Sequence, residues 1–458
     1  MEAMDIQAVE SKLSDVTVTA IPMSGKSTHK DLSISGNSHA TISTVPASSP
    51  SSIGKDKDNG MSNGSLMAAT WNTKCKWQTG YSADSVEWCP VEPWRHVLVC
   101  GTYQLDKSDQ DADQPKQKRL GRIYLFLLNK ITTEISPTQT IDTAGILDMK
   151  WCYHKIQGHP VLAVVTSDGY IQLYRLLDEN GTLKLELWIE DAICGNVLAL
   201  SVDWSSNKTS TAQPSLVVSD SSGAVTVFRI FGRSLEKMGY WLGHSFEAWI
   251  AAFNYWNPDV FYSGGDDCMF KSYDVRVADV PTATNRSHEA GVTAIRSQIH
   301  VEHQLLTGSY DEKVRLWDAR SLKRCITETD VNGGVWRLKW HPSNTSVVLA
   351  ACMYGGFRVL RVTDEVAVMC EYVEHESIAY GADWQFDAKS TVESDDTPES
   401  NGKSTAESDG KSTAESDDKA TAESDKSTVD SDDKSIVATC SFYDCSMHIG
   451  EIVIQKCL

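Results

Sequence analysis

The stretch that decides the fold is HEAGVTAIRSQIHVEHQLLTGSYDEKVRLWDAR, residues 288–320. It contains three short runs rich in apolar residues, which end near residues 297, 309 and 317, and polar segments separate them. Runs of this length bounded by Gly, Ser and Asp are typical of β-strands joined by tight turns. The stretch therefore indicates consecutive strands of an antiparallel sheet.

The same pattern recurs along the chain. The first run of each copy ends at Trp88, Trp151, Trp204, Phe253, Ser297, Trp340 or Trp384, with spacings of 63, 53, 49, 44, 43 and 44 residues. A period of about 40–45 residues is typical of β-propellers, in which each blade has four strands. The copy at 288–320, with His288 and Trp317-Asp318, also resembles the WD repeat. Seven copies predict an all-β, seven-bladed WD-repeat propeller.

Aromatic residues indicate which parts of the chain can fold. All 39 lie within 71–386 and 442–458. Segments without them bury too little apolar surface to offset chain entropy, so we expect a disordered leader at 1–70 and a disordered insertion at 387–434. Blades one to six and the start of blade seven then occupy 71–386, and 435–458 completes blade seven.

The insertion is acidic and repetitive. It repeats KSTAESD and holds 15 acidic and 6 basic residues, and we place it between the first and second strands of blade seven. Its Ser-Asp steps suit acidophilic kinases, whereas the simpler interpretation is a solvated spacer.

Charge and composition exclude several function classes. A net charge of −20 argues against nucleic-acid and anionic-membrane binding. The chain contains no apolar run of the roughly 18 residues that cross a membrane, and it has no signal-peptide core. The 12 cysteines lack any Cys-x-x-Cys spacing, which favours buried thiols over disulfides or zinc. His300-Val301-Glu302-His303 is interpreted as a solvated loop. We expect a cytoplasmic protein without a bound metal.

Three residues resemble a hydrolase triad: His288, Ser309 and Asp311. In WD repeats, however, these positions form a hydrogen-bonded chain with Trp317 that ties the strands of a blade together. His244 with Asp267, and His375 with Asp444, occupy the same repeat positions. No Gly-x-Ser-x-Gly motif accompanies them, so the structural interpretation is favoured.

A second set of residues occupies loop positions where the repeat requires nothing. These loops precede the first strands or follow the second strands, and they open on one face. They carry Glu247, Trp249, Trp336, Tyr380 and Asp84 near the first strands, and Asp266, Tyr310 and Tyr443 in the turns. A ring of aromatics with carboxylates suits a quaternary ammonium or another cation. The alternative is a protein docking patch.

Several strings resemble the diphthine methyl ester hydrolase family, the WD-repeat enzymes of diphthamide biosynthesis. They are ADSVEWCP (83–90), FEAWIAAFNYW (246–256), YSGGDD (262–267), GGVWRLKWHP (333–342) and YGADW (380–384). The resemblance implies hydrolysis of the methyl ester on the trimethylated, modified histidine of elongation factor 2. The product is diphthine, and the reaction needs no cofactor.

The resemblance also suggests roles for the ring of aromatics and acids. Trp249, Trp336, Tyr310, Tyr443 and Tyr380 would hold the trimethylammonium group. Glu247 or Asp266 would act as the base, and Arg337 would stabilise the oxyanion. His244 is a candidate only if it is not held in its blade.

The rival hypothesis is a scaffold without catalysis. Such propellers serve as substrate receptors of cullin-type ubiquitin ligases and dock through a Trp-Asp-x-Arg sequence. Here Trp317-Asp318-Ala319-Arg320 fits that pattern, and Tyr273-Asp274-Val275-Arg276 is related to it.

Overall fold

The computed structural model describes residues 69–106, 118–193, 195–211, 213–277, 280–386 and 433–455. The chain divides into two units, residues 1–63 and 64–458, and every described residue belongs to the second. Nearly all of the expected leader and of the acidic insertion lies outside the described residues. The expectation of disorder was wrong for Ala69, Thr70, Asp433 and Lys434, which lie in strands, and for the other residues of 1–70 and 387–434 it stays a prediction.

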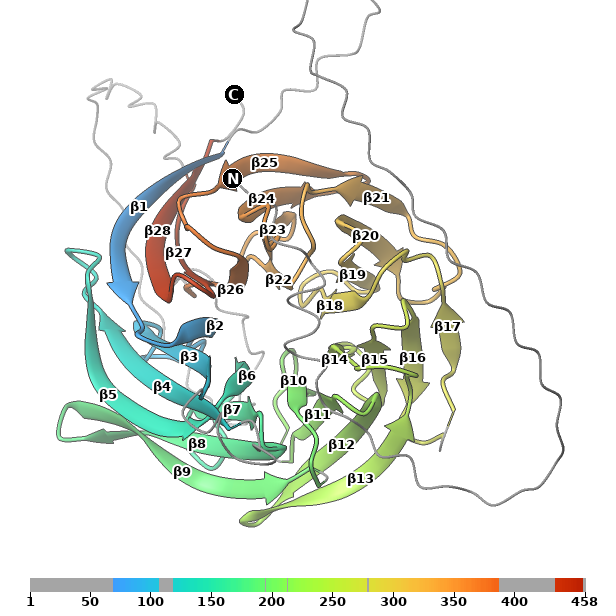
Figure 1. Ribbon diagram of the computed structural model, residues 1–458, viewed down its shortest axis with the longest axis horizontal. Helices are drawn as coiled ribbons and strands as arrows, with labels where there is room; N and C mark the ends of the chain where they lie inside the picture. Colours follow the sequence, from blue (N-terminus) through green and yellow to red (C-terminus); the bar gives the residue numbers. More distant parts are fainter. Residues whose placement is uncertain are drawn as a thin grey trace, which may run out of the picture. The chain divides into compact units, whose positions relative to one another are not determined.

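In the described part, 28 strands form seven four-stranded antiparallel sheets (Figure 1). This confirms the predicted seven-bladed propeller. Blades one to three follow the chain order. They comprise β2 (Ser82–Trp88), β3 (Val97–Leu105), β4 (Arg119–Leu128) and β5 (Ile135–Ala144); β6 (Ile146–Trp151), β7 (Val161–Thr166), β8 (Tyr170–Glu179) and β9 (Thr182–Ala192); and β10 (Ala199–Trp204), β11 (Ser215–Asp220), β12 (Ala224–Phe231) and β13 (Ser234–Leu242).

Blades four to six continue the same order. They comprise β14 (Ile250–Phe253), β15 (Val260–Gly264), β16 (Phe270–Asp274) and β17 (Ala283–Asn285); β18 (Val292–Ser297), β19 (Gln304–Ser309), β20 (Lys313–Asp318) and β21 (Thr327–Asp330); and β22 (Arg337–Trp340), β23 (Val347–Ala351), β24 (Phe357–Val362) and β25 (Val366–Tyr372).

Blade seven joins the two ends of the second unit. Its inner strands are β26 (Ala379–Trp384), β27 (Asp433–Ser441) and β28 (Ser446–Ile454), and its outer strand is β1 (Ala69–Gln78). Figure 1 shows β1, in blue, lying beside β28, in red. The sequence analysis did not identify this closing strand, because its residues alternate between exposed and half-buried positions instead of forming an apolar run.

The first strands explain the repeated tryptophans. These strands contact one another in a closed ring around the centre, from β2 through β6, β10, β14, β18 and β22 to β26. The indole nitrogens of Trp151, Trp204 and Trp384 donate hydrogen bonds to the backbone carbonyls of Glu87, Lys150 and Lys339 in neighbouring blades. A buried indole needs such a partner, and here the partner links one blade to the next.

The triad-like residues of blade five form the internal tie of that blade. His288 hydrogen-bonds to Asp311 at 3.1 Å and to the hydroxyl of Thr307 at 2.8 Å, and Trp317 donates to the same hydroxyl. The sequence analysis assigned this hydroxyl to Ser309, which was wrong, because Thr307, two residues earlier, supplies it. The Oγ of Ser309 instead donates to the carbonyl of Ala290.

Antiparallel blades give the propeller two faces. The connections between first and second strands open on one face, called here the insertion face because the acidic insertion begins after Phe386 there. The connections before the first strands and after the second strands open on the other, called the aromatic face.

In the described residues no helix is long and apolar enough to cross a membrane, and the ten described cysteines are free thiols.

Candidate functional site

Six aromatic side chains gather at the start of the first strands, and together they form what we call the aromatic cluster. Their centroids lie 4.7–6.3 Å apart in a connected series from blade four to blade seven. The structure thus brings together all five predicted binding aromatics and adds Phe442. The members are Trp249, Tyr310, Trp336, Tyr380, Phe442 and Tyr443.

The rings of the cluster differ in accessibility. Trp336 and Tyr380 are buried, with exposed fractions of 9% and 4%. Tyr443 is 46% exposed, while Trp249 and Tyr310 are half-buried. Burial also raises the pKa of Tyr380 far above its usual value. A ligand on this face therefore meets Trp249, Tyr310 and Tyr443, and the other two predicted aromatics support them from below.

Asp266 is held against the exposed rings. The indole nitrogen of Trp249 donates to Asp266 Oδ1 at 3.0 Å. A Cβ on Gly291 would lie 2.7 Å from that oxygen and 3.1 Å from the ring of Tyr310. Glycine at 291 therefore lets the carboxylate and the ring approach each other.

Glu247 lies beside Asp266 through the backbone, since the Asp266 amide donates to the Glu247 carbonyl at 2.9 Å. Both predicted base candidates therefore sit at the edge of the aromatic cluster, and both are partly exposed.

His244, the third base candidate, is held in blade four. Its Nδ1 hydrogen-bonds to Asp267 at 2.8 Å and its Nε2 to the Ser263 hydroxyl at 2.6 Å. The side chain is 5% exposed, and both ring nitrogens are engaged. This is the arrangement of His288 in blade five, so the geometry gives His244 the same structural role.

Arg337, the predicted oxyanion partner, lies below the rings, and its guanidinium group already contacts acidic side chains and a backbone carbonyl. Its Nη2 lies 3.1 Å from Asp148 Oδ1, donates to the Leu147 carbonyl at 3.1 Å, and is 4.0 Å from Asp84 Oδ1. Its guanidinium lies 5.9 Å from the Trp336 ring centroid. Arg337 therefore can act only on a ligand group that enters the channel beneath the cluster.

Asp84 was placed in the ring of aromatics and acids by the sequence analysis, which gave it no catalytic role. It is 2% exposed, and its Oδ1 has no hydrogen-bond partner among the described residues. Burial raises its pKa to about 8, although Arg337 opposes the shift. Near neutral pH it is therefore mainly a carboxylic acid that can donate a proton. Its only sequence signal was an acid at the repeat position that Trp249 occupies in blade four.

A chain of buried ion pairs continues from this point along the channel. Asp148 contacts Lys150 at 2.6 Å, and Lys150 contacts Glu87 at 2.9 Å. Glu87 also contacts Lys339 at 2.6 Å, and Lys339 reaches Asp383 at 3.3 Å. In the described part of the chain, no three His, Cys, Asp or Glu side chains are grouped to hold a metal ion.

Comparison with other proteins first defines the class. Residues 279–318 match the family described as WD domain, G-beta repeat. A chain in the crystal structure of a mitotic checkpoint complex superposes with a TM-score of 0.56 at 13% identity, covering 88% of this chain and 98% of that one. The protein is therefore a WD-repeat propeller. Residues 1–61, outside the described part, match the family described as cyclin-dependent kinase 2-associated protein.

Longer relatives then define the family. Diphthine methyltransferases of Mus musculus and Homo sapiens are 42% identical over 326 and 332 residues, which is 67% of this chain and 68% and 73% of theirs. A diphthine methyltransferase homolog of Dictyostelium discoideum is 35% identical over 348 residues, or 67% of this chain and 90% of that protein. The chain belongs to the diphthine methyltransferase family, which confirms the resemblance noted from the sequence.

Proposed function

We propose that the protein is a cytoplasmic enzyme of diphthamide biosynthesis that hydrolyses the methyl ester of methylated diphthine on elongation factor 2. The products are diphthine and methanol. The observation that carries this proposal is 42% identity to proteins named diphthine methyltransferase over two-thirds of the chain. The exposed part of the aromatic cluster supports it, because the substrate carries a trimethylammonium group.

The aromatic cluster suits that group electrostatically. The faces of Trp249, Tyr310 and Tyr443 attract a cation through the ring quadrupole, and a cation that cannot donate hydrogen bonds gains most from such contacts. Asp266, fixed by Trp249, adds a carboxylate at the same place. The cluster would thus hold the substrate nitrogen and leave the nearby ester beside the acids.

Ester hydrolysis needs a proton acceptor for water, a donor for the oxyanion and a proton for the leaving group. Asp266 or Glu247 would take a proton from water as its oxygen attacks the ester carbonyl. Arg337 would stabilise the tetrahedral oxyanion if the ester enters the channel. Asp84, as a carboxylic acid, would protonate the departing methoxide to give methanol. No step consumes a cofactor.

Oxygen labelling tests this reaction. Purified protein is incubated in ¹⁸O-water with methyl-esterified elongation factor 2 from cells that lack the protein, and products are analysed by mass spectrometry. Attack at the carbonyl places ¹⁸O in the diphthine carboxylate and leaves methanol unlabelled. Label in methanol would mean attack on the methyl carbon, which is a methyl transfer to water. Unchanged substrate after incubation, or normal diphthamide in the cells that lack the protein, would refute the assignment.

A second candidate function rests on two exposed arginines. Arg320 and Arg276 each pair with an aspartate two residues earlier at 2.6 Å, and their side chains are 67% and 64% exposed. We infer that the segment Trp317-Asp318-Ala319-Arg320, with the exposed side chain of Arg320, docks a ligase adaptor. Co-purification of an adaptor that is lost with Arg320→Glu would support the inference, and unchanged co-purification would contradict it.

A further inference from the structure

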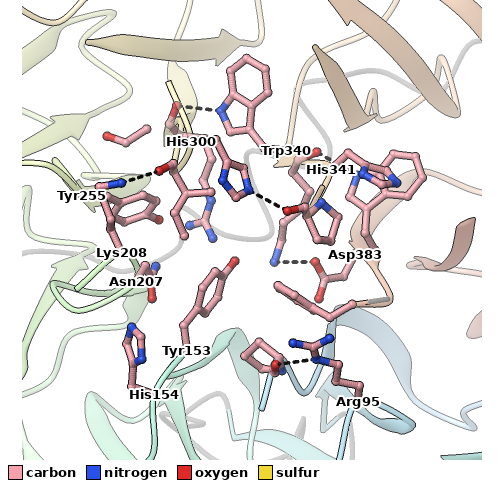
Figure 2. A pocket seen from close by; sticks show the side chains of 18 residues that line it. Arg95, Tyr153, His154, Asn207, Lys208, Tyr255, His300, Trp340, His341 and Asp383 are labelled. Carbon is pink, nitrogen blue, oxygen red and sulfur yellow. Dashed lines mark hydrogen bonds and ion pairs between the residues drawn. The ribbon is translucent and has the colours of Figure 1, made fainter. Parts of the chain in front are cut away.

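A cavity of about 200 Å³ opens at the centre of the insertion face (Figure 2). Its lining residues are at the ends of the first strands or directly after them, whereas the aromatic cluster lies where the first strands begin. The cavity is therefore at the opposite end of the channel from the proposed active site. Every blade contributes to it, and nothing in the proposed reaction uses it.

The walls of this cavity are cationic. Arg95, Lys208, Arg296 and Lys339 line it, against the single carboxylate of Asp383. Two of the cations are neutralised deeper in the channel. Lys339 pairs with Glu87 and Asp383, and Arg296 lies 3.3 Å from Asp203. Arg95 pairs with the half-exposed Glu92 at 3.1 Å.

Lys208 differs from the other three cations. Its Nζ donates to the Ile299 carbonyl at 3.2 Å and lies 3.5 Å from the Trp256 ring centroid. No carboxylate of the described residues lies within ion-pair distance of it. A half-buried ammonium group is costly without an opposite charge, and its remaining N–H groups can bind an anion.

Tyr153 supplies a second donor. Figure 2 shows its hydroxyl directed into the cavity, and no hydrogen bond within the described structure engages that hydroxyl. The ring packs edge-on against Phe386 with centroids 5.3 Å apart, which fixes its orientation. Lys208 and Tyr153 both line the cavity. Figure 2 shows the Lys208 side chain at its edge and the Tyr153 hydroxyl nearer its centre.

We propose that this cavity binds one oxyanionic group, a carboxylate or a phosphate, through Lys208 and Tyr153. Charged donors form the strongest hydrogen bonds with such oxygens. The volume is below the roughly 300–1,000 Å³ of pockets that hold whole small-molecule ligands. The occupant is therefore a single acidic group, carried either by a free small anion or by a side chain of a protein ligand. The two ends of the channel would then select opposite charges.

Titration calorimetry of the full chain tests the site, with inorganic phosphate and acetate as probes and sodium chloride at matched ionic strength as the reference. Lys208→Gln should weaken binding at least tenfold, and Tyr153→Phe about fivefold while keeping the packing on Phe386. The matched controls Lys184→Gln and Tyr240→Phe, on outer strands, should bind as the wild type does. Ester hydrolysis should be unchanged in all four variants.

A phosphoserine peptide distinguishes the two sources of the group. Binding at least tenfold tighter than inorganic phosphate, and sensitive to both variants, would assign a protein-borne group. Equal or weaker binding, with the same sensitivity, would assign a free anion. Absence of saturable binding of all probes, or equal losses in the control variants, would overturn the site. If Lys208→Gln fails to fold, the effect of Tyr153→Phe on phosphate and acetate binding still decides whether the site exists.

Discussion

At the scale of single residues, Trp249 combines two tasks. Its indole nitrogen fixes Asp266 Oδ1 at 3.0 Å, while its ring lies 5.8 Å from Trp336 and 6.3 Å from Tyr310 between centroids. Cation attraction needs the ring face, whereas the hydrogen bond uses the ring edge, so the two do not compete. A carboxylate positioned in this way is the better base candidate of the two at the edge of the cluster.

Asp266→Asn should lower kcat for ester hydrolysis about 100-fold or more, because a positioned general base typically contributes about 10²–10⁴-fold. The amide is isosteric and can still accept from Trp249, so folding should be unaffected. Single-turnover assays on methyl-esterified elongation factor 2 give the rate. Glu247→Gln is the matched comparison, and the larger loss identifies the base. If both variants keep full activity, neither carboxylate is the base.

Tyr443→Leu should raise KM and leave kcat nearly unchanged. The ring is 46% exposed and packs on Phe442, so it can contact a ligand without supporting the fold. A cation–π contact is worth about 0.5–2 kcal/mol, which predicts a rise of about 2–30-fold. Tyr443→Phe keeps the ring face and should retain the wild-type KM. A fall in kcat with unchanged KM would contradict a binding role.

At the scale of elements, closure of the ring depends on β1. Trp71 of this strand stacks on Tyr372 of blade six, with centroids 4.5 Å apart and planes inclined by 8°. Gly450 of the neighbouring β28 leaves room for the indole, since a Cβ there would lie too close to it. The Thr73 hydroxyl also hydrogen-bonds to the Tyr372 hydroxyl at 2.9 Å, so a strand that is distant in sequence from blade six is fixed to it by polar and aromatic contacts.

Trp71→Ala should reduce the free energy of unfolding by about 2 kcal/mol, less than the roughly 3–5 kcal/mol of a fully buried aromatic, because Trp71 is half-buried. Urea titration monitored by circular dichroism measures the loss. Leu242→Ala, at a side chain 69% exposed, should change stability by no more than about 0.5 kcal/mol. Equal losses in the two variants would mean that β1 does not hold the ring closed.

Blade seven should also make stability depend on pH. His375 and His448 stack with centroids 3.7 Å apart, and burial lowers their pKa values to about 3 and about 4. The positive charge of nearby Lys76 also lowers both pKa values, whereas the negative charge of Asp444 raises them and so opposes the shift. Because histidine titrates near 6.5 in the unfolded chain, unfolding takes up protons below that pH. The contribution of these two histidines to stability should therefore be constant above pH 6.5 and fall progressively toward pH 4. Asp84, with its pKa raised to about 8, contributes a change of the opposite sign, which is common to the wild type and a His448 variant.

Urea titrations at pH 7.5, 5.5 and 4.5 measure this dependence, and His448→Gln should show a shallower decline than the wild type. Carboxylates with lowered pKa values, such as Asp444, lose their contribution only at lower pH, near and below about 3.9. Parallel declines in the wild type and the variant would contradict the assignment to the stacked histidines.

At the scale of the whole molecule, the repeat itself was readable because each first strand ends in a residue that donates a hydrogen bond to the preceding blade. The closing strand β1 was missed because its pattern belongs to a solvated outer edge. Thr307 was missed because the polar turn offers two hydroxyls, and only the register of β19 decides between them. The repeat position of Asp84 did not predict its raised pKa, because that shift comes from burial and because its neighbours Arg337 and Asp148 lie on strands far apart in the sequence.

The buried ion pairs join neighbouring blades and also blades that are far apart in sequence. Glu87 of β2 contacts Lys150 of β6 and Lys339 of β22, so one carboxylate links blades one, two and six across the channel. Burial alone would raise the pKa of Glu87, yet the two lysines bring it below its usual value. Removing this charge leaves two buried ammonium groups with fewer partners.

Glu87→Gln should therefore cost about 3–5 kcal/mol of unfolding free energy, the range for breaking a buried ion pair. Glu451→Gln, which breaks a partly exposed pair with Lys74 at 3.1 Å, should cost only about 0–1 kcal/mol. Urea titration gives both values. Hydrogen exchange adds a test of the link, because faster exchange is expected in β6 and β22 as well as in β2. Faster exchange in β2 alone would mean that the ion pairs stabilise single blades and do not connect them.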